Sequence, residues 1–308
     1  MEHHDLIILG AGAAGLTAAV YAGRSGVDAI LLEKGAVGGQ ITTTSEVENW
    51  PGTKKISGFE LAASLQEHAE HLGADIRMAD ITGIDFSGRE KVVHTEDGSF
   101  SADSLIVCTG ARHSQLGVPG ETELAGRGVS YCAVCDGPFF RNEEIMVVGG
   151  GDTAVEEAEY LSRFAAKVYI VHRRDQFRAA AVLVKRVLAN PKIVPVWDSV
   201  VTKINGKTGV ESAAIRNVKT GEEIDLKVTG AFIFVGMSPN SEPFKQSGLD
   251  MSREGWITVD HKTLQTNIPG VFAAGDVRDT SLRQMITAAA DGARAAMSAY
   301  AYLSEHKG

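Results

Sequence analysis

The sequence predicts an α/β fold of two three-layer domains, the second inserted into the first. A buried strand, a glycine-rich loop, a helix and another buried strand follow one another at residues 5–33 and again at 144–171. A further apolar strand at 270–277 ends in Gly-Asp and leads into a long Ala-rich helix at 281–303. Two separate units of this kind favour parallel sheets covered by helices.

The composition fits two domains of ordinary size. The chain has 308 residues, 44% of them hydrophobic, and a formal net charge of −9. This charge argues against a nucleic-acid partner, which needs a basic face. No apolar run approaches the roughly 20 residues of a membrane span, and the start of the chain lacks a signal-peptide pattern. We therefore expect a cytoplasmic protein with no nucleic-acid and no membrane partner.

The first unit is a complete Rossmann-like dinucleotide fingerprint. After the strand at 5–9, Gly10 permits a tight turn, Gly12 lets a pyrophosphate approach the backbone, and Gly15 lets the helix at 16–24 pack on the strand. The next strand, 27–32, is followed by Glu33, which can accept hydrogen bonds from ribose hydroxyls. The alternative is a Gly-rich turn without a ligand, which the flanking elements disfavour.

The segment that follows alternates loops with short elements. The polar loop at 38–52 has neither helical nor strand period, and it is either a cover for a flat polar ligand or a plain surface loop. We expect an amphipathic helix at 58–72, a hairpin turn at 95–99 and a buried strand at 104–108. The polar, Gly-rich stretch at 112–128 predicts a domain junction.

The second unit ends in cations instead of an acid. Its strand at 144–148, helix at 155–163 and strand at 167–171 lead into His172, Arg173, Arg174 and Arg178. Guanidinium groups bind phosphate through paired, charge-assisted hydrogen bonds, so this site should prefer NADPH to NADH. A solvated basic face at the start of a helix is the weaker alternative.

The remaining segments set the domain boundaries. Short strands and hairpins are expected at 197–228, a buried strand at 231–235, and a second crossing between domains near 237–244. The C-terminal strand and helix pair with the first fingerprint. The first domain is therefore expected to comprise residues 1–113 and 244–308, around an inserted domain at 114–243.

Two of the three cysteines form a Cys-x-x-Cys pair, Cys132 and Cys135, between the two glycine-rich loops. Such a pair closes as a reducible disulfide, and one thiol usually has a lowered pKa. A dithiol between two dinucleotide sites suggests electrons that pass from one cofactor through another into a disulfide. Half a zinc site is a weak alternative, since the pair lacks a second Cys-x-x-Cys or paired His ligands. We therefore expect no metal. Cys108 is expected to be a buried small hydrophobe, and His3 and His4 a mobile polar terminus.

These motifs, in this order along essentially the whole chain, resemble the low-molecular-weight thioredoxin reductases. The matching segments are Gly10–Gly15, Gly38–Gln40, Glu46–Gly52, Cys132–Gly137, Gly149–Glu157, His172–Arg178, Gly270–Val277 and Arg283–Gln284. The resemblance implies FAD on the first unit, NADPH on the second, a homodimer, and thioredoxin as the electron acceptor. Asp276 should then bind the ribityl chain, while Arg283, Gln284 and Met285 lie along the flavin.

The expected site residues fall into three sets. The catalytic set is Cys132, Cys135 and Asp136. The FAD set is Gly10, Gly12, Ala14, Gly15, Glu33, Gly39, Gln40, Asn49, Thr109, Gly110, Gly275, Asp276, Arg283, Gln284 and Met285. The NADPH set is Gly149, Gly151, Asp152, Thr153, Ala154, His172, Arg173, Arg174 and Arg178.

The roles within the catalytic set are expected as follows. By resemblance, Cys135 is the sulfur nearer the flavin, whereas the thiol that first attacks thioredoxin stays open. Asp136 is the candidate acid that protonates a leaving thiolate, and its alternative role is that of a turn residue before Gly137. Disulfide and nicotinamide belong to one domain and must both reach one flavin. We therefore expect that domain to rotate about linkers near 112–118 and 237–244.

Three other functions remain open from the sequence. The first is a related flavoprotein disulfide reductase that serves a peroxiredoxin-linked or glutaredoxin-like partner. The second is an NAD(P)H diaphorase or oxidase in which the cysteines are incidental. The third is a redox-sensing or structural dimer that binds FAD without turnover.

Overall fold

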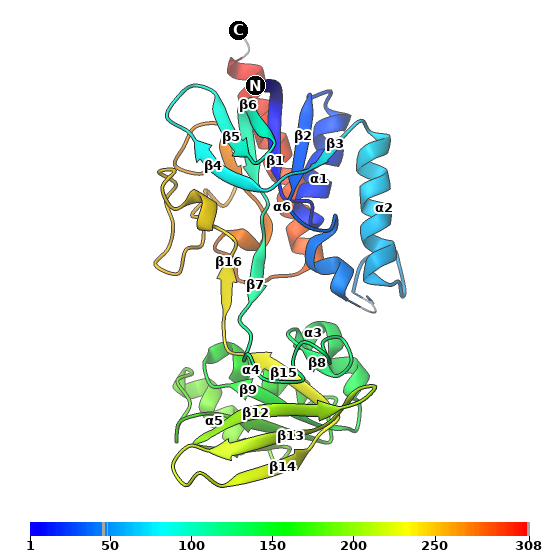
Figure 1. Cartoon of the computed structure of the whole chain (residues 1–308), viewed down its shortest axis with the longest axis vertical. Coiled ribbons are helices and arrows are strands. Elements are labelled where there is room, and N and C mark those ends of the chain that lie inside the picture. The colour runs from blue at the N-terminus through cyan, green and yellow to red at the C-terminus, as the bar shows by residue number, and fades with distance from the viewer. Residues whose placement is uncertain (45–46, 48, 307–308) are drawn as a thin grey trace. The chain divides into compact units, whose positions relative to one another are not determined.

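The computed structural model describes residues 1–44, 47 and 49–306 and divides the chain into two compact units (Figure 1). Unit 1 comprises Met1–Arg112 and Ser238–Gly308, and unit 2 comprises His113–Met237. Residues 238–243, which the sequence analysis places in the inserted domain, group with unit 1. The two crossings, β7 (Ala111–His113) and β16 (Met237–Pro239), pair with each other as a short ladder.

Unit 1 is built on a seven-stranded mixed sheet. In order across the sheet, its strands are β3 (Asp75–Met78), β2 (Ala29–Glu33), β1 (Glu2–Leu9), β6 (Gly98–Val107), β5 (Lys91–Thr95) and β4 (Ile81–Asp85), and β17 (Val271–Ala273) also pairs with β6. The pairs β1–β2, β2–β3, β1–β6 and β17–β6 are parallel, whereas β4 and β5 form an antiparallel extension. The pairing of β17 with β6 places the C-terminal segment in the first sheet, as expected.

Two helices, α1 (Ala13–Arg24) and α6 (Met285–His306), contribute side chains to the hydrophobic core on one face of this sheet. A third helix, α2 (Gly58–His71), begins with a capping box made by Ser57 and Glu60. The backbones of α1 and α6 approach closely at Gly292, where an added Cβ would lie 2.0 Å from the carbonyl oxygen of Ala14. This contact requires a residue without a side chain.

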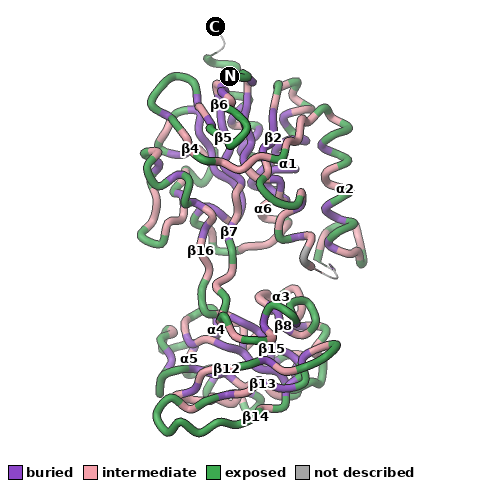
Figure 2. Tube along the Cα trace, in the orientation of Figure 1, coloured by how far each residue is buried: buried purple, intermediate pink, exposed green. Residues whose placement is uncertain are grey.

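Unit 2 is built on a five-stranded parallel sheet between helices and a second sheet. The order is β11 (Ile193–Val196), β10 (Lys167–Val171), β9 (Glu144–Gly149), β15 (Gly230–Phe234) and β8 (Val129–Ser130). Helices α4 (Asp152–Leu161) and α5 (Ala181–Ala189) pack in one core. The antiparallel strands β12 (Ser199–Gly206) and β13 (Val210–Asn217) pack in the other, and β14 (Glu223–Lys227) forms an exposed edge (Figure 2).

Several element boundaries differ from the sequence predictions. The segment at 38–52, predicted to have no helical period, contains the 3₁₀ helix η1 (Gly39–Thr43), while residues 45, 46 and 48 of the matching segment lie outside the described residues. The strand predicted at 270–277 ends at Ala273. Gly275 then takes a left-handed φ of 74° and starts the 3₁₀ turn η4 (Gly275–Val277). Helix α5, which buries Leu183 and Val187, was not predicted.

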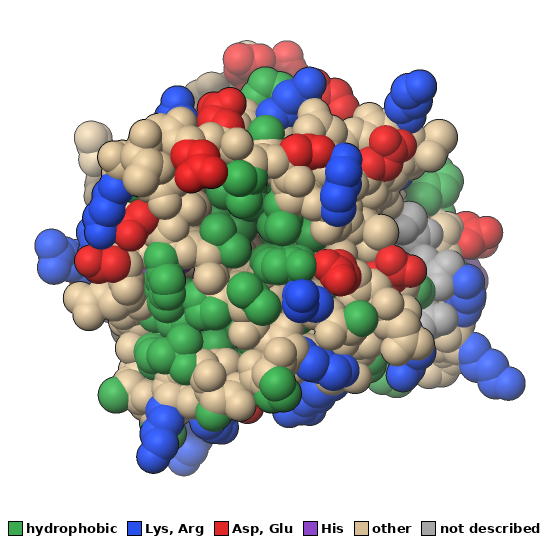
Figure 3. Space-filling model, turned by 90° about the horizontal axis from the view of Figure 1, so that it is seen from below, with side chains coloured by type: hydrophobic (Ala, Val, Ile, Leu, Met, Phe, Trp, Pro, Cys, Tyr) green, Lys and Arg blue, Asp and Glu red, His purple; other side chains and the backbone are tan. Residues whose placement is uncertain are grey.

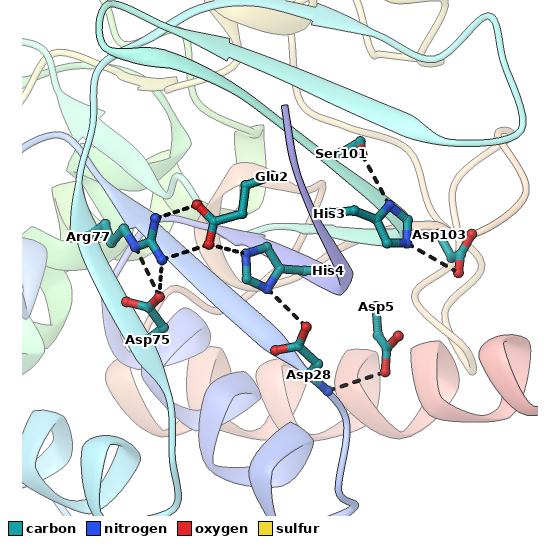
Figure 4. Close-up of polar contacts among 9 residues, drawn as sticks. All are labelled: Glu2, His3, His4, Asp5, Asp28, Asp75, Arg77, Ser101 and Asp103. Atoms are coloured by element: carbon teal, nitrogen blue, oxygen red, sulfur yellow. Dashed lines mark hydrogen bonds and ion pairs between the residues drawn. The ribbon is translucent and has the colours of Figure 1, made fainter.

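The N-terminus is ordered, so the expectation of a mobile polar terminus is wrong for His3 and His4, which lie in β1. The His4 ring is buried, and its two nitrogens lie 3.1 Å from an Asp28 oxygen and 3.2 Å from a Glu2 oxygen (Figure 4). Arg77 makes paired hydrogen bonds to Glu2 and also binds Asp75. This network joins the N-terminal end of β1 to neighbouring segments of the sheet. The glycine-rich loop follows the opposite, C-terminal end of the same strand.

Within the described residues, no helix has the length and apolar character needed to cross a membrane.

A buried ion pair fixes the turn η4 on helix α6. Asp291 is almost fully buried, and one of its oxygens accepts hydrogen bonds from Gly275 N at 3.2 Å and from Arg278 Nε at 2.6 Å. Its other oxygen accepts from Arg294 Nη2 at 2.6 Å. The carboxylate thus holds the backbone of the turn and neutralises the buried Arg278 guanidinium.

Replacing Asp291 should be strongly destabilising. In the Asp291→Ala variant the Arg278 charge stays buried without a partner, so we expect the free energy of unfolding to fall by about 3 kcal/mol or more. Urea denaturation followed by circular dichroism measures this loss. The control is Arg294→Ala, whose half-exposed side chain should contribute less than about 1 kcal/mol. Equal effects of the two substitutions would contradict this account.

Candidate active site

The first glycine-rich loop follows the central strand β1. The strands β2 and β6 pair with β1 on its two opposite sides. Gly10 has φ 101°, and a Cβ there would lie 2.6 Å from the Cys108 carbonyl oxygen. A Cβ on Gly15 would lie 1.8 Å from the Gly10 oxygen, whereas one on Gly12 would meet no atom within 4 Å. Two glycines are thus required by packing, and the middle one leaves the backbone open to a ligand.

The acid at the end of β2 is held against this loop. One oxygen of Glu33 accepts a hydrogen bond from Ala11 N at 2.6 Å, and the other accepts from Gly35 N at 2.7 Å. Each carboxylate oxygen retains acceptor capacity for a hydroxyl group. Gly39 also lies beside the loop, because a Cβ on it would be 3.6 Å from Gly12 Cα.

The turn η4 brings a buried carboxylate to the same loop. Gly275 packs against Ala14, with 3.0 Å from an added Cβ to the Ala14 Cβ. Among the described residues, the buried Oδ1 of Asp276 has no hydrogen-bond partner. Burial raises the pKa of Asp276 to about 6, although the Arg283 charge opposes this shift. An unpaired buried acceptor fits a ligand that carries hydroxyl groups.

Arg283 is a half-buried residue whose Nε atom is buried. Its Nε has no partner among the described residues, and its guanidinium lies 4.0 Å from the centre of the Trp256 ring. Burial lowers the pKa of Arg283, and the Asp276 charge opposes this effect. The cation–π contact fixes the guanidinium next to the turn.

The other expected FAD residues of unit 1 fall into two groups. Asn49 Nδ2 donates to Gln284 Oε1 at 3.1 Å, and Met285 packs against the cluster that contains Ala13. Gln40 donates to the Ala111 carbonyl. Thr109 Oγ1 instead donates to the Asn240 carbonyl at 2.7 Å, and Gly110, with φ 69°, has open space at its Cα. The structure therefore joins Asn49 to Gln284 and uses the Thr109 side chain within the crossing segment.

The second loop repeats this design after β9, between β10 and β15. A Cβ on Gly149 would lie 2.5 Å from the Phe234 oxygen, and one on Gly151 would meet no atom within 4 Å. Asp152 accepts a hydrogen bond from Ala180 N at 2.7 Å. Thr153 is exposed in the first turn of α4, and Ala154 is buried. The middle glycine again leaves the backbone open.

Gly150 is a site residue that the sequence analysis missed. A Cβ there would lie 2.2 Å from Nδ1 of His172, so the imidazole rests directly on this glycine. The run of three glycines at 149–151 was the available signal. His172 is buried beside Phe177 and Trp197, and its Nε2 has no partner among the described residues. Burial, reinforced by the nearby Arg178, lowers the pKa of His172.

The predicted arginines line one pocket of unit 2. Its volume is about 310 Å³, and its lining residues are Arg173, Arg174, Asp175, Gln176, Phe177, Arg178, Asp198, Val218 and Lys219. The three arginines, expected from the sequence, lie together here. The acid Asp198 and the cation Lys219 were missed, because they come from β-hairpin segments far along the chain.

The cysteine pair forms a disulfide in unit 2, with 5.3 Å between the two Cα atoms. Cys132 caps the short helix α3 (Ala133–Asp136), and its sulfur accepts a hydrogen bond from Cys135 N at 3.2 Å. The Ser130 hydroxyl accepts from Cys132 N at 3.1 Å. The helix start thus places the Cys135 backbone N–H at the Cys132 sulfur, and a donor in this position favours a thiolate there.

Asp136 is the last residue of α3 and directly follows Cys135. Burial raises the pKa of its carboxyl group, while a hydrogen bond with Ser130 opposes the shift. A carboxyl group with a raised pKa keeps its proton closer to neutral pH, as a general acid requires. Ser130, absent from the expected site, therefore contacts both Asp136 and Cys132.

The disulfide is flanked by exposed apolar side chains. Val134, between the two cysteines, is 38% exposed, and Phe139, in η2 (Gly137–Phe140), is 45% exposed. Hydrophobic side chains also gather over one face of the molecule, with charged groups around them (Figure 3). Cys108, by contrast, is buried as expected, and burial strongly raises the pKa of its thiol. In the described part of the chain, no group of three or more His, Cys, Asp or Glu side chains could hold a metal ion.

Comparison with known proteins agrees with these features. Residues 4–292 match the family model described as pyridine nucleotide-disulphide oxidoreductase. The thioredoxin reductase of Bacillus subtilis is 46% identical over 306 residues, which cover 98% of this chain and 95% of the relative. That of Streptomyces coelicolor is 47% identical over 304 residues, 97% of this chain and 94% of the relative.

A solved structure gives the same result. The thioredoxin reductase of Streptococcus pyogenes superimposes with a TM-score of 0.94 at 48% identity, over 98% of this chain and 99% of that one. With two glycine-rich loops, a Cys-x-x-Cys disulfide and a family match over nearly its whole length, this chain belongs to the pyridine nucleotide-disulphide oxidoreductases.

Proposed function

We propose that this protein is a thioredoxin reductase that transfers electrons from NADPH through FAD and the Cys132–Cys135 pair to oxidised thioredoxin. The observation that carries the proposal is the disulfide in unit 2, in the same unit as a glycine-rich loop and an arginine-lined pocket. Relatives at 45–47% identity over nearly the whole chain are named thioredoxin reductases.

Unit 1 offers the features that FAD requires. The open backbone at Gly12 and the start of α1 suit its pyrophosphate, and Glu33 suits a ribose. The unpaired Oδ1 of Asp276 suits a ribityl hydroxyl, and Arg283, Gln284 and Met285 extend from the same turn toward the start of α6. When bound, FAD accepts a hydride from NADPH and supplies two electrons to a disulfide.

Unit 2 offers the features that NADPH requires. Gly151 leaves the backbone open at the start of α4, where the helix N-terminus favours phosphate. Arg173, Arg174 and Arg178 line a pocket with three permanent cations, which suits a 2′-phosphate. The His172 ring packs against Gly150 of the loop, and it stays neutral because burial and the arginines lower its pKa.

The cysteine pair would then act as follows. Two electrons and two protons convert the Cys132–Cys135 disulfide into two thiols. One thiolate attacks the disulfide of thioredoxin, which gives a mixed disulfide and a leaving thiolate. The second cysteine resolves the mixed disulfide, so that the original bond re-forms and thioredoxin leaves as a dithiol. Asp136 donates the proton that a leaving thiolate takes up, and exposed Val134 and Phe139 give a partner protein an apolar contact.

Three further points belong to this proposal. The protein acts as a homodimer in the cytoplasm. Unit 2 rotates during turnover, because disulfide and nicotinamide must reach one flavin in turn. Thioredoxin is preferred as the partner over peroxiredoxin-linked or glutaredoxin-like proteins, since the curated relatives carry its name.

The cysteine pair should be indispensable for thioredoxin reduction. Cys132→Ser and Cys135→Ser should each abolish thioredoxin-dependent NADPH consumption, because a single cysteine can neither form the disulfide that accepts two electrons nor resolve the mixed disulfide. Cys108→Ala, which alters the buried third thiol, is the control and should stay active. The assay follows NADPH and NADH oxidation by the yellow protein with and without thioredoxin. Unchanged turnover in both serine variants would show a diaphorase or oxidase instead.

Asp136 should assist proton transfer. The Asp136→Asn variant lacks the acid, so we expect thioredoxin-dependent turnover to fall by about 10²-fold or more, with NADPH binding unchanged. Because burial raises the pKa of Asp136, the wild-type rate should persist to higher pH than an ordinary aspartic acid would allow. Rates measured between pH 5 and 9 test this. A variant as fast as the wild type would leave Asp136 as a turn residue.

Asp276 should make the stability of the apoprotein depend on pH, and it should also contribute to FAD binding. Its folded pKa of about 6 lies above the ordinary 3.8, so the folded apoprotein binds the proton more tightly. Stability of the apoprotein should therefore fall as pH rises, by roughly 2 kcal/mol between about pH 4 and pH 6. Asp276→Asn should flatten this slope and weaken FAD binding about tenfold or more. Denaturation at several pH values and FAD titration by fluorescence measure both effects, with Asp279→Asn as the exposed control. A slope that persists in Asp276→Asn would contradict the assignment.

A further inference from the structure

The arginine-lined pocket contains charges that the fingerprint does not explain. Arg173, Arg174 and Arg178 share it with the carboxylates of Asp175 and Asp198. A phosphate group that enters the pocket shares it with these two acids, and the repulsion between like charges opposes its binding. The pocket therefore needs a group that offsets the acids.

Lys219 is that group. Its Nζ lies 3.0 Å from Asp198 Oδ2 and 3.5 Å from Asp175 Oδ2, so one ammonium contacts both carboxylates. Asp198 is the more buried of the two, with 17% of its side chain exposed, and its hydrogen bond is the main cause that raises the pKa of Lys219. With Lys219 present, four cations line the pocket against two acids.

The backbone places Lys219 at the pocket. Asn217, at the end of β13, accepts hydrogen bonds on its side-chain oxygen from Lys219 N at 2.9 Å and from Thr220 N at 3.0 Å, which shapes the turn before β14. Val218 N donates to the Asp198 carbonyl at 2.6 Å, and Asp198 N donates to the Arg174 carbonyl at 3.1 Å. The hairpin tip is thus fastened, through Asp198, to the arginine segment.

We propose that Lys219 is a further determinant of NADPH specificity: it neutralises Asp198 and Asp175 and adds a fourth cation for the 2′-phosphate. This inference rests on the proposed use of NADPH by unit 2. An ammonium group has three donors, so Lys219 can hold a carboxylate and still bind a phosphate oxygen. Without it, neither carboxylate would keep the ion pair that the structure gives it, and only the three arginines would oppose the two acids.

The test compares binding of 2′,5′-ADP and 5′-AMP to the FAD-loaded protein by calorimetry, since the two probes differ in the 2′-phosphate. In Lys219→Gln, the affinity for 2′,5′-ADP should fall about fivefold, while that for 5′-AMP stays unchanged. The loss should shrink at high salt, because the pocket is open to solvent. Lys219→Arg should retain the affinity of the wild type.

The matched control is Lys227→Gln. Lys227 lies on β14 of the same hairpin, pairs with Asp225 at 2.7 Å and is not a lining residue of the pocket. Its substitution therefore removes the same charge from the hairpin at a position outside the pocket. A second background, Lys219→Gln with Asp198→Asn, should regain part of the lost affinity. Asn tolerates the left-handed φ of 51° at this position, so the backbone should keep its form.

Three outcomes would overturn the inference. The first is a Lys219→Gln variant that binds 2′,5′-ADP like the wild type, or no more weakly than Lys227→Gln does. The second is an equal loss for both probes, which would indicate a general effect on the fold. The third is a double variant that stays as weak as Lys219→Gln, which would exclude neutralisation of Asp198. If the wild type does not prefer 2′,5′-ADP to 5′-AMP, the NADPH assignment itself fails, and this inference with it.

Discussion

The close approach of backbone atoms at the two glycine-rich turns is the constraint on which the structure depends. After β1 the chain packs so tightly that a methyl group on Gly15 would overlap the Gly10 carbonyl oxygen. At the end of β9, a methyl group on Gly149 would overlap the Phe234 carbonyl oxygen of the neighbouring strand β15. These turns direct the N-termini of α1 and α4 toward the end of a central parallel strand, where unpaired N–H groups collect. Each sheet then buries its central strands from both faces, which leaves this edge as the place where a ligand can bind.

The sequence predicts these units well because each is local. Strand, loop, helix and strand follow one another within about thirty residues, and the glycines mark the turn directly. The sequence analysis also assigned the C-terminal segment to the first fingerprint, but it did not identify β6 as the strand with which β17 pairs. Helix α5 escaped prediction because it follows an arginine-rich segment and buries only Leu183 and Val187. The order of His4 escaped because its partners Asp28 and Glu2 become visible only when β1 and β2 pair.

The site shows the same division. The cysteine pair and the arginines can be read as motifs, and the structure places the arginines in one pocket. The groups that support them come from elsewhere in the chain. Ser130 accepts a hydrogen bond from the Cys132 N–H, and Asp291 holds the turn that carries Asp276. Lys219, from a distant hairpin, lines the same pocket as the arginines. A linear pattern cannot reveal such partners, because tertiary pairing alone brings them together.

The ladder between β7 and β16 has a consequence for how the chain could be divided. Ser114 N donates to the Gly236 carbonyl at 2.9 Å, so the first and last residues of unit 2 are neighbours. Unit 2 is also one continuous segment with its own two hydrophobic cores. Unit 2 could therefore be expressed alone, cut at its two paired ends, without an added linker. A short linker between residues 112 and 238 would then join the two segments of unit 1.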